Sequence, residues 1–410
     1  MGTPTKVEDN VDCCIAGGGP AGMMLGFLLA RAGLKVVVLE KHADFFRDFR
    51  GDTIHPSTIQ IMEELGLLDE FLKVPHQEVI ELKAIFNDFE FTVADFSHLP
   101  VAKPVLGLMP QWDFLNFVAA QAAKYPTFKL IKEAKVTGLL RDGKRITGVE
   151  AETPGGILQV KAKLTMGADG RSSIVRQLEG LKVIKTGAPI DVLWFRLSQR
   201  SDDPPYTFGR FSHGNIIILL NRKEYWQCAY VIEKGGFEKI QKDGLENFRK
   251  QLASVSPFLA DRLIELKSWD DIKLLSVDID HLEQWYSEGL LCIGDAAHAM
   301  SPIGGVGINL AIQDAVAAAN ILYPHFSGAE IDVSVLKQVQ DRREWPTRVI
   351  QKVQVIIQNI IRKGRGQTNI KPPLLLRMFN LFPILRRIPA RVVGLGIRPE
   401  HIRTPDVNKM

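Results

Sequence analysis

The sequence predicts an α/β fold of at least two domains, and three observations lead to this prediction. A short apolar run at 11–16 is followed at once by a glycine-rich turn and then by apolar residues at helical spacing from 23 to 32. Two more apolar strands, at 163–168 and 290–293, each end in a turn that holds an aspartate and a glycine. Three further segments read as strands of a second sheet: 191–197, 215–220 and 225–232.

The glycine-rich turn carries a G-x-G-x-x-G pattern through Gly17, Gly19 and Gly22. Glycines at these positions let the backbone turn tightly and approach a pyrophosphate, which the free amides at the next helix start then stabilise. The strand at 34–39 ends at Glu40, where a carboxylate can accept hydrogen bonds from a ribose hydroxyl. A lone glycine triplet would be weak evidence, but with its flanking strands and terminal acid it predicts a Rossmann-like dinucleotide site.

The composition is that of an ordinary globular protein, with 46% hydrophobic and 24% charged residues. The sequence shows no charged-then-apolar signal segment and no uninterrupted apolar run of transmembrane length, so we expect a cytoplasmic protein. We expect no metal site, because no metal-ligand spacing occurs. Four cysteines occupy apolar, strand-like contexts and are interpreted as buried reduced thiols: Cys13, Cys14, Cys228 and Cys292.

The net charge of +4 is unevenly distributed, because residues 345–399 hold eleven Lys or Arg and no Asp or Glu. Such asymmetry indicates an anionic surface as partner. The segment 374–393 mixes apolar residues with arginines, which suits peripheral contact with anionic lipid as well as it suits a helical cap with a solvated basic face. For the helix at 345–363 we favour the cap. Nucleic acid is not expected, since no recognised motif accompanies the charge.

The three turns, at 17–22, at Ala168-Asp169-Gly170 and at Gly294-Asp295, give the chain a resemblance that spans roughly 11–322. In this order they resemble the group A flavin-dependent aromatic hydroxylases, typified by para-hydroxybenzoate hydroxylase. The resemblance implies a glutathione-reductase type, Rossmann-like FAD-binding domain interleaved with a smaller mixed-sheet substrate domain, and the apolar stripe and basic residues after 345 predict a helical C-terminal segment. The implied parts are 1–78, 106–184 and 285–344 for the FAD-binding domain, 79–105 and 185–284 for the substrate domain, and 345–410 for the basic helical region.

The resemblance also implies cofactor contacts. Glu40 binds the adenosine ribose, Asp169 belongs to a motif linked to FAD and NAD(P)H with Arg176 nearby, and Asp295 bonds the ribityl chain. The loop at 302–309 brackets the flavin ring, and the helix start that follows suits negative charge on the reduced ring. The remaining implied cofactor-binding residues are Gly17, Gly19, Pro20, Ala21, Gly22, Lys41, Arg50, Gln111, Pro302, Gly304, Gly307, Ile308 and Asn309.

The implied activity is that of an FAD-dependent monooxygenase. NAD(P)H reduces the flavin, O₂ adds to give a C4a-hydroperoxyflavin, and one oxygen passes to an aromatic, phenolic or quinol-like ring. The arginine–tyrosine set that grips a benzoate carboxylate in the type enzyme has no clear counterpart, so we expect a fairly apolar substrate. Two alternatives are an FAD-dependent reductase of isoprenoid-type double bonds and a flavin-binding regulatory protein without turnover.

Several roles stay open at this point. No side chain is assigned as a catalytic acid, base or nucleophile, and His298 is interpreted as a packed histidine rather than a base. Alternation places Trp226, Cys228 and Tyr230 on one face of the second sheet and Gln227 on the other. The pattern does not decide which face meets the substrate. We also expect Ser57 to cap the helix at 58–65.

Overall fold

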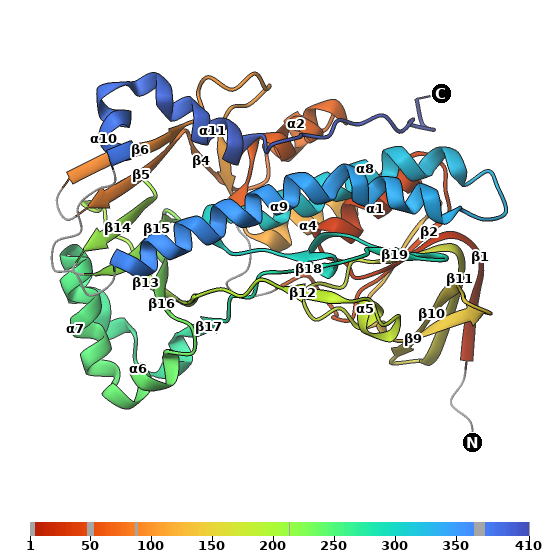
Figure 1. The fold of residues 1–410 in the computed structure, drawn as a ribbon, viewed down its shortest axis with the longest axis horizontal. Coiled ribbons are helices and arrows are strands. Elements are labelled where there is room, and N and C mark those ends of the chain that lie inside the picture. The colour runs from red at the N-terminus through yellow and green to blue at the C-terminus, as the bar shows by residue number, and fades with distance from the viewer. Residues whose placement is uncertain (1–4, 47–52, 87–88, 213, 365–373, 410) are drawn as a thin grey trace.

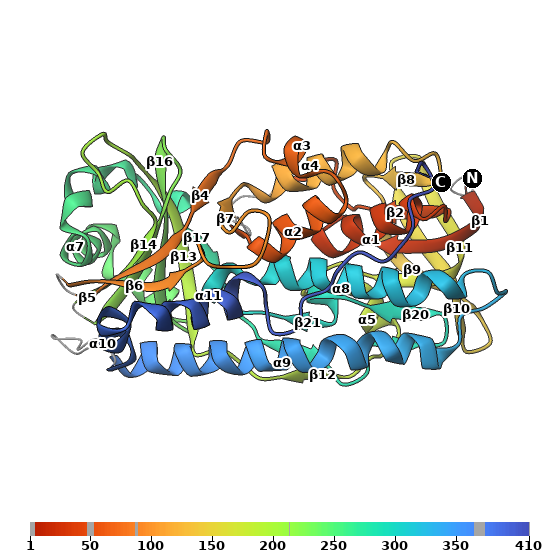
Figure 2. The same ribbon diagram turned by 90° about the horizontal axis from the view of Figure 1, so that it is seen from above.

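The computed structural model describes residues 5–46, 53–86, 89–212, 214–364 and 374–409. Two sheets lie side by side along the long axis of the molecule, and one long helix runs beside both of them (Figures 1 and 2). The strands of the first sheet are β19 (Tyr286–Ser287), β20 (Leu290–Cys292), β11 (Gly156–Gly167), β1 (Thr5–Ala16), β2 (Val36–Leu39) and β8 (Phe128–Ile131), in this spatial order. In addition, β10 (Arg145–Thr153) pairs with β11, and β9 (Lys135–Asp142) pairs with β10.

The parallel strands of the first sheet end level with one another. Ala16 at the end of β1 lies opposite Leu39 of β2 and opposite Gly167 of β11, and Gly167 lies opposite Cys292 of β20. The chain segments that follow these four residues therefore leave the sheet at the same edge. This is the arrangement that places ligands at the carboxyl ends of an open α/β sheet.

Two buried helices pack together beside this sheet, α1 (Pro20–Arg31) and α8 (Gly307–Leu322). α1 begins at Pro20, earlier than the apolar spacing predicts, because proline suits the first helical position. Residues 303–325 are apolar and long enough to cross a membrane, but 78% of the most apolar 18-residue stretch within them is buried inside the fold, so α8 is a core helix. The four cysteines are free and buried, as predicted.

The second sheet contains seven strands from two distant parts of the sequence. One of its faces packs on helical elements, α7 (Leu245–Val255) and η1 (Pro257–Glu265), through the aromatic and aliphatic side chains of one hydrophobic cluster. In spatial order the strands are β17 (Lys273–Leu275), β13 (Ile190–Ser198), β16 (Tyr225–Glu233), β15 (Asn215–Asn221), β14 (Phe208–Ser212), β5 (Glu81–Phe86) and β6 (Phe89–Asp95).

Short elements connect the two sheets. Two three-stranded sheets consist of β3 (Thr53–Ile54), β7 (Leu106–Leu108) and β4 (Gln77–Val79), and of β12 (Val183–Lys185), β18 (Asp280–Leu282) and β21 (His298–Ala299). The remaining short helices are α2 (Pro56–Glu64), α3 (Leu68–Phe71), α4 (Gln111–Ala122), α5 (Ile174–Leu178), α6 (Phe237–Asp243), η2 (Trp269–Asp271), η3 (Gly294–Ala296), η4 (Ile303–Gly305) and η5 (Tyr323–His325). The predicted Ser57 cap is wrong, because α2 begins at Pro56 with His55 as its N-cap residue.

The C-terminal region begins with a long helix, α9 (Val333–Gly364), so the domain boundary expected at 345 falls inside a helix. It continues through α10 (Leu374–Leu381), η6 (Pro383–Arg386) and α11 (Arg387–Gly394), which lie beside β6 of the second sheet. The last residues return to the first sheet, where Arg31 donates to the carbonyl of Thr404 at 2.9 Å. This region thus contacts both sheets (Figure 2).

A buried ionic cluster joins α8 to α9. Asp314 is fully buried and accepts hydrogen bonds from His298 Nε2 at 2.5 Å, Arg343 Nε at 3.0 Å and the amide of Gly294 at 3.0 Å. Arg343 also lies 3.3 Å from Glu400. Burial alone raises the pKa of Asp314, but the charges and hydrogen bonds of His298 and Arg343 outweigh it and hold that pKa below its usual value. His298 is therefore a packed histidine, as interpreted from the sequence.

We predict that Asp314→Asn lowers the free energy of unfolding by roughly 3–5 kcal/mol, because it removes the buried carboxylate that pairs with Arg343 and accepts hydrogen bonds from His298 and the Gly294 amide. Urea unfolding at neutral pH measures this loss. The matched control is Asp341→Asn, which breaks an exposed ion pair with Lys337 within α9. This variant should leave the unfolding midpoint unchanged. Equal midpoints for the two variants would contradict the role of the cluster.

Candidate functional site

The three turns predicted from the sequence touch one another at the edge of the first sheet. A Cβ on Gly17 would lie 2.3 Å from the carbonyl oxygen of Ala168, and a Cβ on Gly294 would lie 3.0 Å from the Ala21 side chain. Gly17 also has φ of +109°, a conformation that L side chains rarely adopt. The absence of side chains at these two glycines therefore lets the three turns pack together.

The glycines of the fingerprint serve different purposes. A Cβ on Gly22 would lie 2.0 Å from the carbonyl oxygen of Gly17, so this glycine lets the helix pack on its own turn. A Cβ on Gly19 meets no heavy atom within 4 Å, and Gly307 at the start of α8 is equally open. Neither α1 nor α8 has an acidic residue in its first turn. Open backbone at two helix starts fits the phosphates and ring of a dinucleotide cofactor.

Glu40 lies directly beside the glycine turn and is 8% exposed. One carboxylate oxygen accepts from the amide of Gly18 at 3.0 Å, and the other accepts from the amide of His42 at 3.0 Å. The carboxylate is therefore held at the end of β2, where the predicted contact with a ribose would occur. The neighbouring Lys41 is exposed.

Asp169 has two differently placed oxygens. Oδ2 accepts from the amides of Ile174 at 2.7 Å and Val175 at 3.2 Å, which fixes the start of α5. Oδ1 is buried without a hydrogen-bond partner among the described residues, and burial raises the pKa of this carboxyl. An unpartnered buried oxygen at this edge fits a contact with a bound cofactor.

The arginine that contacts another predicted cofactor-binding residue is Arg171, whereas the sequence pointed to Arg176. Arg176 is buried and ion-paired with Asp280 at 3.3 Å, so the structure gives it a structural role. Arg171, which was not predicted, lies 3.1 Å from Asp295 and donates to the carbonyl of Met300 at 3.0 Å. It thereby connects the second turn to the third. Its position just after the Asp-Gly motif was the only sequence signal for it.

The loop predicted to bracket the flavin ring is fastened by the side chain of Asn309. Its Oδ1 accepts from the amide of His55 at 2.8 Å, and its Nδ2 donates to the carbonyl of Thr53 at 3.1 Å and that of Gly305 at 3.3 Å. Gly304 and Gly305 have positive φ angles of 79° and 62°. The Asn309 side chain therefore shapes the loop, which leaves its backbone amide in the first turn of α8 for the predicted cofactor contact.

His55 is a site residue that the sequence did not reveal. It is 1% exposed, its Nδ1 lies 2.6 Å from the carbonyl of Val393 in α11, and the carbonyls of Gly304 and Gly305 also act on the ring. Burial lowers its pKa to about 4 despite these carbonyls, so the imidazole is neutral at physiological pH. It connects the C-terminal region to the predicted flavin loop.

A row of glutamines on α9 holds the start of the same loop. Gln354 donates to the carbonyls of Ser301 at 2.9 Å and Ile303 at 2.8 Å, and accepts from the amide of Ser301 at 3.2 Å. Gln351 donates to the carbonyl of Ala299 at 3.0 Å, and Gln358 donates to the Ser301 hydroxyl at 2.6 Å. All three are buried. The helix interpreted as a cap therefore positions the loop.

The remaining residues predicted to bind the cofactor lie near the predicted flavin loop or outside the residues that the structure describes. Gln111 is the first residue of α4, three residues after the end of β7, and β7 pairs with β3 beside the Asn309 contacts. Pro302 is half-buried and Ile308 is buried in α8. Arg50 lies outside the described residues. The cofactor roles of all these residues remain predictions.

The structure answers which face of the second sheet meets the predicted site. Trp226, Cys228 and Tyr230 belong to the cluster that packs on α7 and η1. The opposite face carries Ile216 and Val231, which belong to a cluster with the partly buried residues Phe211, Ile218 and Ile303. Because Ile303 belongs to the predicted flavin loop, this inner face is the one that lies against that loop.

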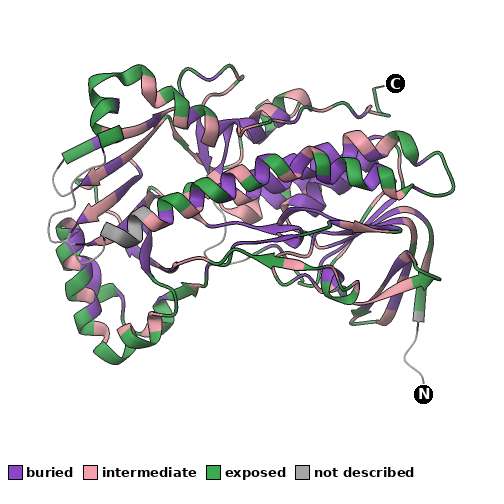
Figure 3. Cartoon of the chain, viewed as in Figure 1, coloured by how far each residue is buried: buried purple, intermediate pink, exposed green. Residues whose placement is uncertain are grey.

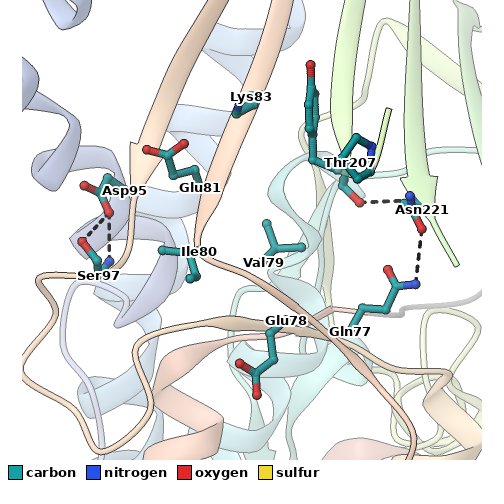
Figure 4. A pocket seen from close by; sticks show the side chains of 12 residues that line it. Gln77, Glu78, Val79, Ile80, Glu81, Lys83, Asp95, Ser97, Thr207 and Asn221 are labelled. Atoms are coloured by element: carbon teal, nitrogen blue, oxygen red, sulfur yellow. Dashed lines mark hydrogen bonds between the residues drawn. The ribbon is translucent and has the colours of Figure 1, made fainter. Parts of the chain in front are cut away.

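A separate hollow of about 440 Å³ lies where β4 and β5 meet β14 and β15 (Figure 4). Gln77 donates to Asn221 at 3.3 Å across it. Three carboxylates, of Glu78, Glu81 and Asp95, are among its lining residues, and none of the predicted cofactor-binding residues is. This polar lining does not suit an apolar aromatic ring.

Comparison with known proteins decides the family. A family model described as FAD binding domain matches residues 10–353, which is most of the chain. The chain belongs to the group A FAD-dependent aromatic monooxygenases. It is an FAD-dependent monooxygenase, with the Rossmann-like fold predicted from its three turns. FAD is its cofactor, in agreement with the open glycine cradle and the unpartnered Asp169 oxygen.

Three similar proteins illustrate the family. The chain is 29% identical over 385 residues to 6-methylpretetramide 4-monooxygenase of Streptomyces rimosus, covering 92% of each protein. It is 25% identical to 3-demethoxyubiquinol 3-hydroxylase of Escherichia coli (strain K12), over 81% of this chain and 85% of that protein. The crystal structure of PqsL, a probable FAD-dependent monooxygenase from Pseudomonas aeruginosa, shares the fold with a TM-score of 0.73 at 23% identity, over 86% of this chain and 97% of that one.

We predict that Gly19→Val abolishes FAD binding but leaves the apoprotein folded, because the new side chain occupies only the open space in front of the turn. Gly22→Val instead clashes with the Gly17 carbonyl and lowers the stability of the apoprotein itself. Flavin fluorescence titration and urea unfolding of apoprotein separate the two effects. Gly155→Val, in a hairpin turn of the same sheet, is the control that keeps both properties.

We predict that part of the acid sensitivity of the fold comes from His55. Its pKa is about 4 in the folded protein and near 6.5 in the unfolded chain, so the unfolded chain binds more protons between these values. The free energy of unfolding therefore falls as pH drops from about 6.5 towards 4, by roughly 3 kcal/mol for this group. His55→Gln should remove that part of the slope, whereas the exposed His401→Gln should not. Parallel slopes for wild type and His55→Gln would contradict this account.

Proposed function

We propose that this enzyme uses NAD(P)H and O₂ to hydroxylate an apolar, electron-rich aromatic ring of the phenol or quinol class. The observation that carries the proposal is the contact of Ile303 with the inner-face cluster of Ile216 and Val231. It sets an apolar cluster of the inner face against the loop predicted to bracket the flavin ring. A flat apolar substrate held there would lie between this cluster and the ring.

The relatives support this substrate class. Their names are 6-methylpretetramide 4-monooxygenase and 3-demethoxyubiquinol 3-hydroxylase, and the second specifies a quinol. The inner-face cluster adjoins a second cluster of Ala84, Phe86 and Phe91, and Phe211 packs against both. Phe86 and Phe211 are stacked with ring centroids 4.4 Å apart. An aromatic wall of this kind favours a ring system larger than a single benzoate.

FAD, once reduced by NAD(P)H, supplies the activation of O₂, and the side chains and amides of this chain position the reactants. The glycine turn and the first-turn amides of α1 bind the pyrophosphate. Asp295, held by Arg171, bonds the ribityl chain. The first-turn amides of α8, without a nearby acid in that turn, stabilise negative charge at the ring edge. The apolar inner face excludes water from the reacting centre.

The test is a screen in which the FAD-loaded protein is mixed with NAD(P)H and a panel of phenols and quinols, while cofactor oxidation, peroxide and product mass are followed. We expect one ligand to accelerate cofactor oxidation at least tenfold, with little peroxide and a product heavier by one oxygen atom. A reduced product that forms without O₂ would favour the isoprenoid-type reductase. Bound FAD with no NAD(P)H oxidation across the panel would favour the regulatory protein.

A substitution on the wall tests where the substrate binds. Ile218 is half-buried on the inner face, and Ile218→Trp should raise the KM for the aromatic substrate at least tenfold because the indole fills the space beside the wall. FAD content should stay unchanged. The matched control, Leu274→Trp, changes an exposed side chain on β17 of the same sheet and should leave KM unchanged. Equal KM values for both variants would place the substrate elsewhere.

A further inference from the structure

After Ile350, which packs in a core cluster, α9 buries its glutamines and exposes several apolar side chains. Its glutamines are buried against the loop at 299–303, whereas Val353 is 38% exposed, Ile356 is 59% exposed and Ile357 is 37% exposed. A helix on the surface of a globular protein normally packs its apolar stripe on the core. Here the glutamines on the core-facing side form hydrogen bonds with the loop at 299–303. The exposed apolar side chains on the other side are therefore available to bind a partner outside the chain.

The segment 374–394 continues this pattern. Its inner side is anchored, because Phe379 is 5% exposed and Leu376 packs on the cluster of Ala84, Phe86 and Phe91. Its outer side nevertheless carries large apolar residues that are mostly exposed (Figure 3): Leu374 at 73%, Leu375 at 58%, Leu381 at 73%, Phe382 at 56%, Ile384 at 64% and Ile388 at 62%. A surface helix needs one apolar side to pack on its own fold. The second apolar side of the segment 374–394 is not used for that packing.

The two segments lie near each other in one view only, because Figure 1 shows α10 and α11 above the second half of α9. α9 and the segment α10–α11 lie along the same edge, the lower one in Figure 2. We call the exposed apolar and basic side chains of 353–357 and 374–391 the basic apolar face. In Figures 1 and 3, α10 lies at the outer rim of the molecule, whereas α9 runs across its middle.

The charge of this face selects its partner. Residues 345–399 contain no Asp or Glu, and Lys352, Arg377, Arg387 and Arg391 are exposed. Arg387 is partly offset by Asp95, whereas Arg377 and Arg391 form no ion pair within the described part of the chain. Two copies joined through this face would oppose arginines without any acid to pair them. An anionic bilayer surface offers apolar depth and negative charge together.

We propose that the basic apolar face docks the protein on a bilayer that carries anionic headgroups. The exposed leucines, isoleucines and Phe382 enter the boundary between headgroups and acyl chains, and the arginines lie at headgroup level. Attachment is peripheral and reversible, because the segment lies on the surface of the fold and does not cross the bilayer. The proposal rests on exposure and charge, and it is independent of the reaction that the enzyme catalyses.

The experiment is co-sedimentation of the full-length, FAD-loaded protein with vesicles of phosphatidylcholine alone and with vesicles that also contain phosphatidylglycerol. We expect roughly tenfold stronger binding to the anionic vesicles, weakened by added salt. The double substitution Leu381→Asp with Phe382→Asp should reduce that binding at least tenfold, because it removes two exposed apolar anchors. Arg377→Glu with Arg391→Glu should abolish the preference for anionic lipid.

The matched control is Ile264→Asp, which removes an equally exposed isoleucine, at 72%, from η1 outside the face. It should bind vesicles as wild type does. FAD content and circular dichroism establish that each variant is folded. Equal binding to both vesicle types, or equal binding by the double variant and the control, would overturn the proposal. A wild-type dimer in sedimentation velocity that the double variant dissolves would overturn it in favour of an interface between copies.

Discussion

The register of the parallel strands is the constraint on which the site depends. Because Ala16, Leu39, Gly167 and Cys292 end level, four chain segments leave the sheet at one edge and must share the space above it. That crowding explains why Gly17 and Gly294 lack side chains. A shift of one residue in any strand pair would turn its side chains to the other face and separate the turns.

The loop beside the predicted flavin ring is held from two directions. On one side Asn309 fastens it to residues 53–55, and on the other the glutamines of α9 hold residues 299–303 through their backbone groups. The C-terminal region also reaches the loop through the contact of His55 with Val393. The helical region that the sequence separates as a basic extension is therefore part of the support of the site.

The sequence predicted those features that depend on local spacing. The three turns and the buried strands before them could be read because glycine, helix starts and apolar runs have local causes. Features that depend on distant partners could not be read. Arg176 could not be separated from Arg171 by sequence, because the choice depends on Asp280, more than one hundred residues away.

The glutamines of α9 show the same limit more clearly. Their position opposite an apolar stripe gives no sign of burial, since their partners are backbone carbonyls some fifty residues earlier in the chain. For the second sheet, the sequence predicted which side chains share a face but not which face lies against the predicted flavin loop. Alternation sorts Trp226 and Gln227 onto different faces, but only the tertiary packing on α7 shows that the tryptophan row faces away from the site.

The use of glutamine amides has a consequence for how the loop at 299–303 responds to its surroundings. Neutral amides neither gain nor lose protons over the biological range, and counterions screen them little. The shape of this loop therefore depends little on the ionic medium, even though arginines are exposed on the neighbouring segment 374–394. The C-terminal region thus combines exposed arginines, whose interactions weaken with added salt, with buried glutamine contacts that depend little on salt.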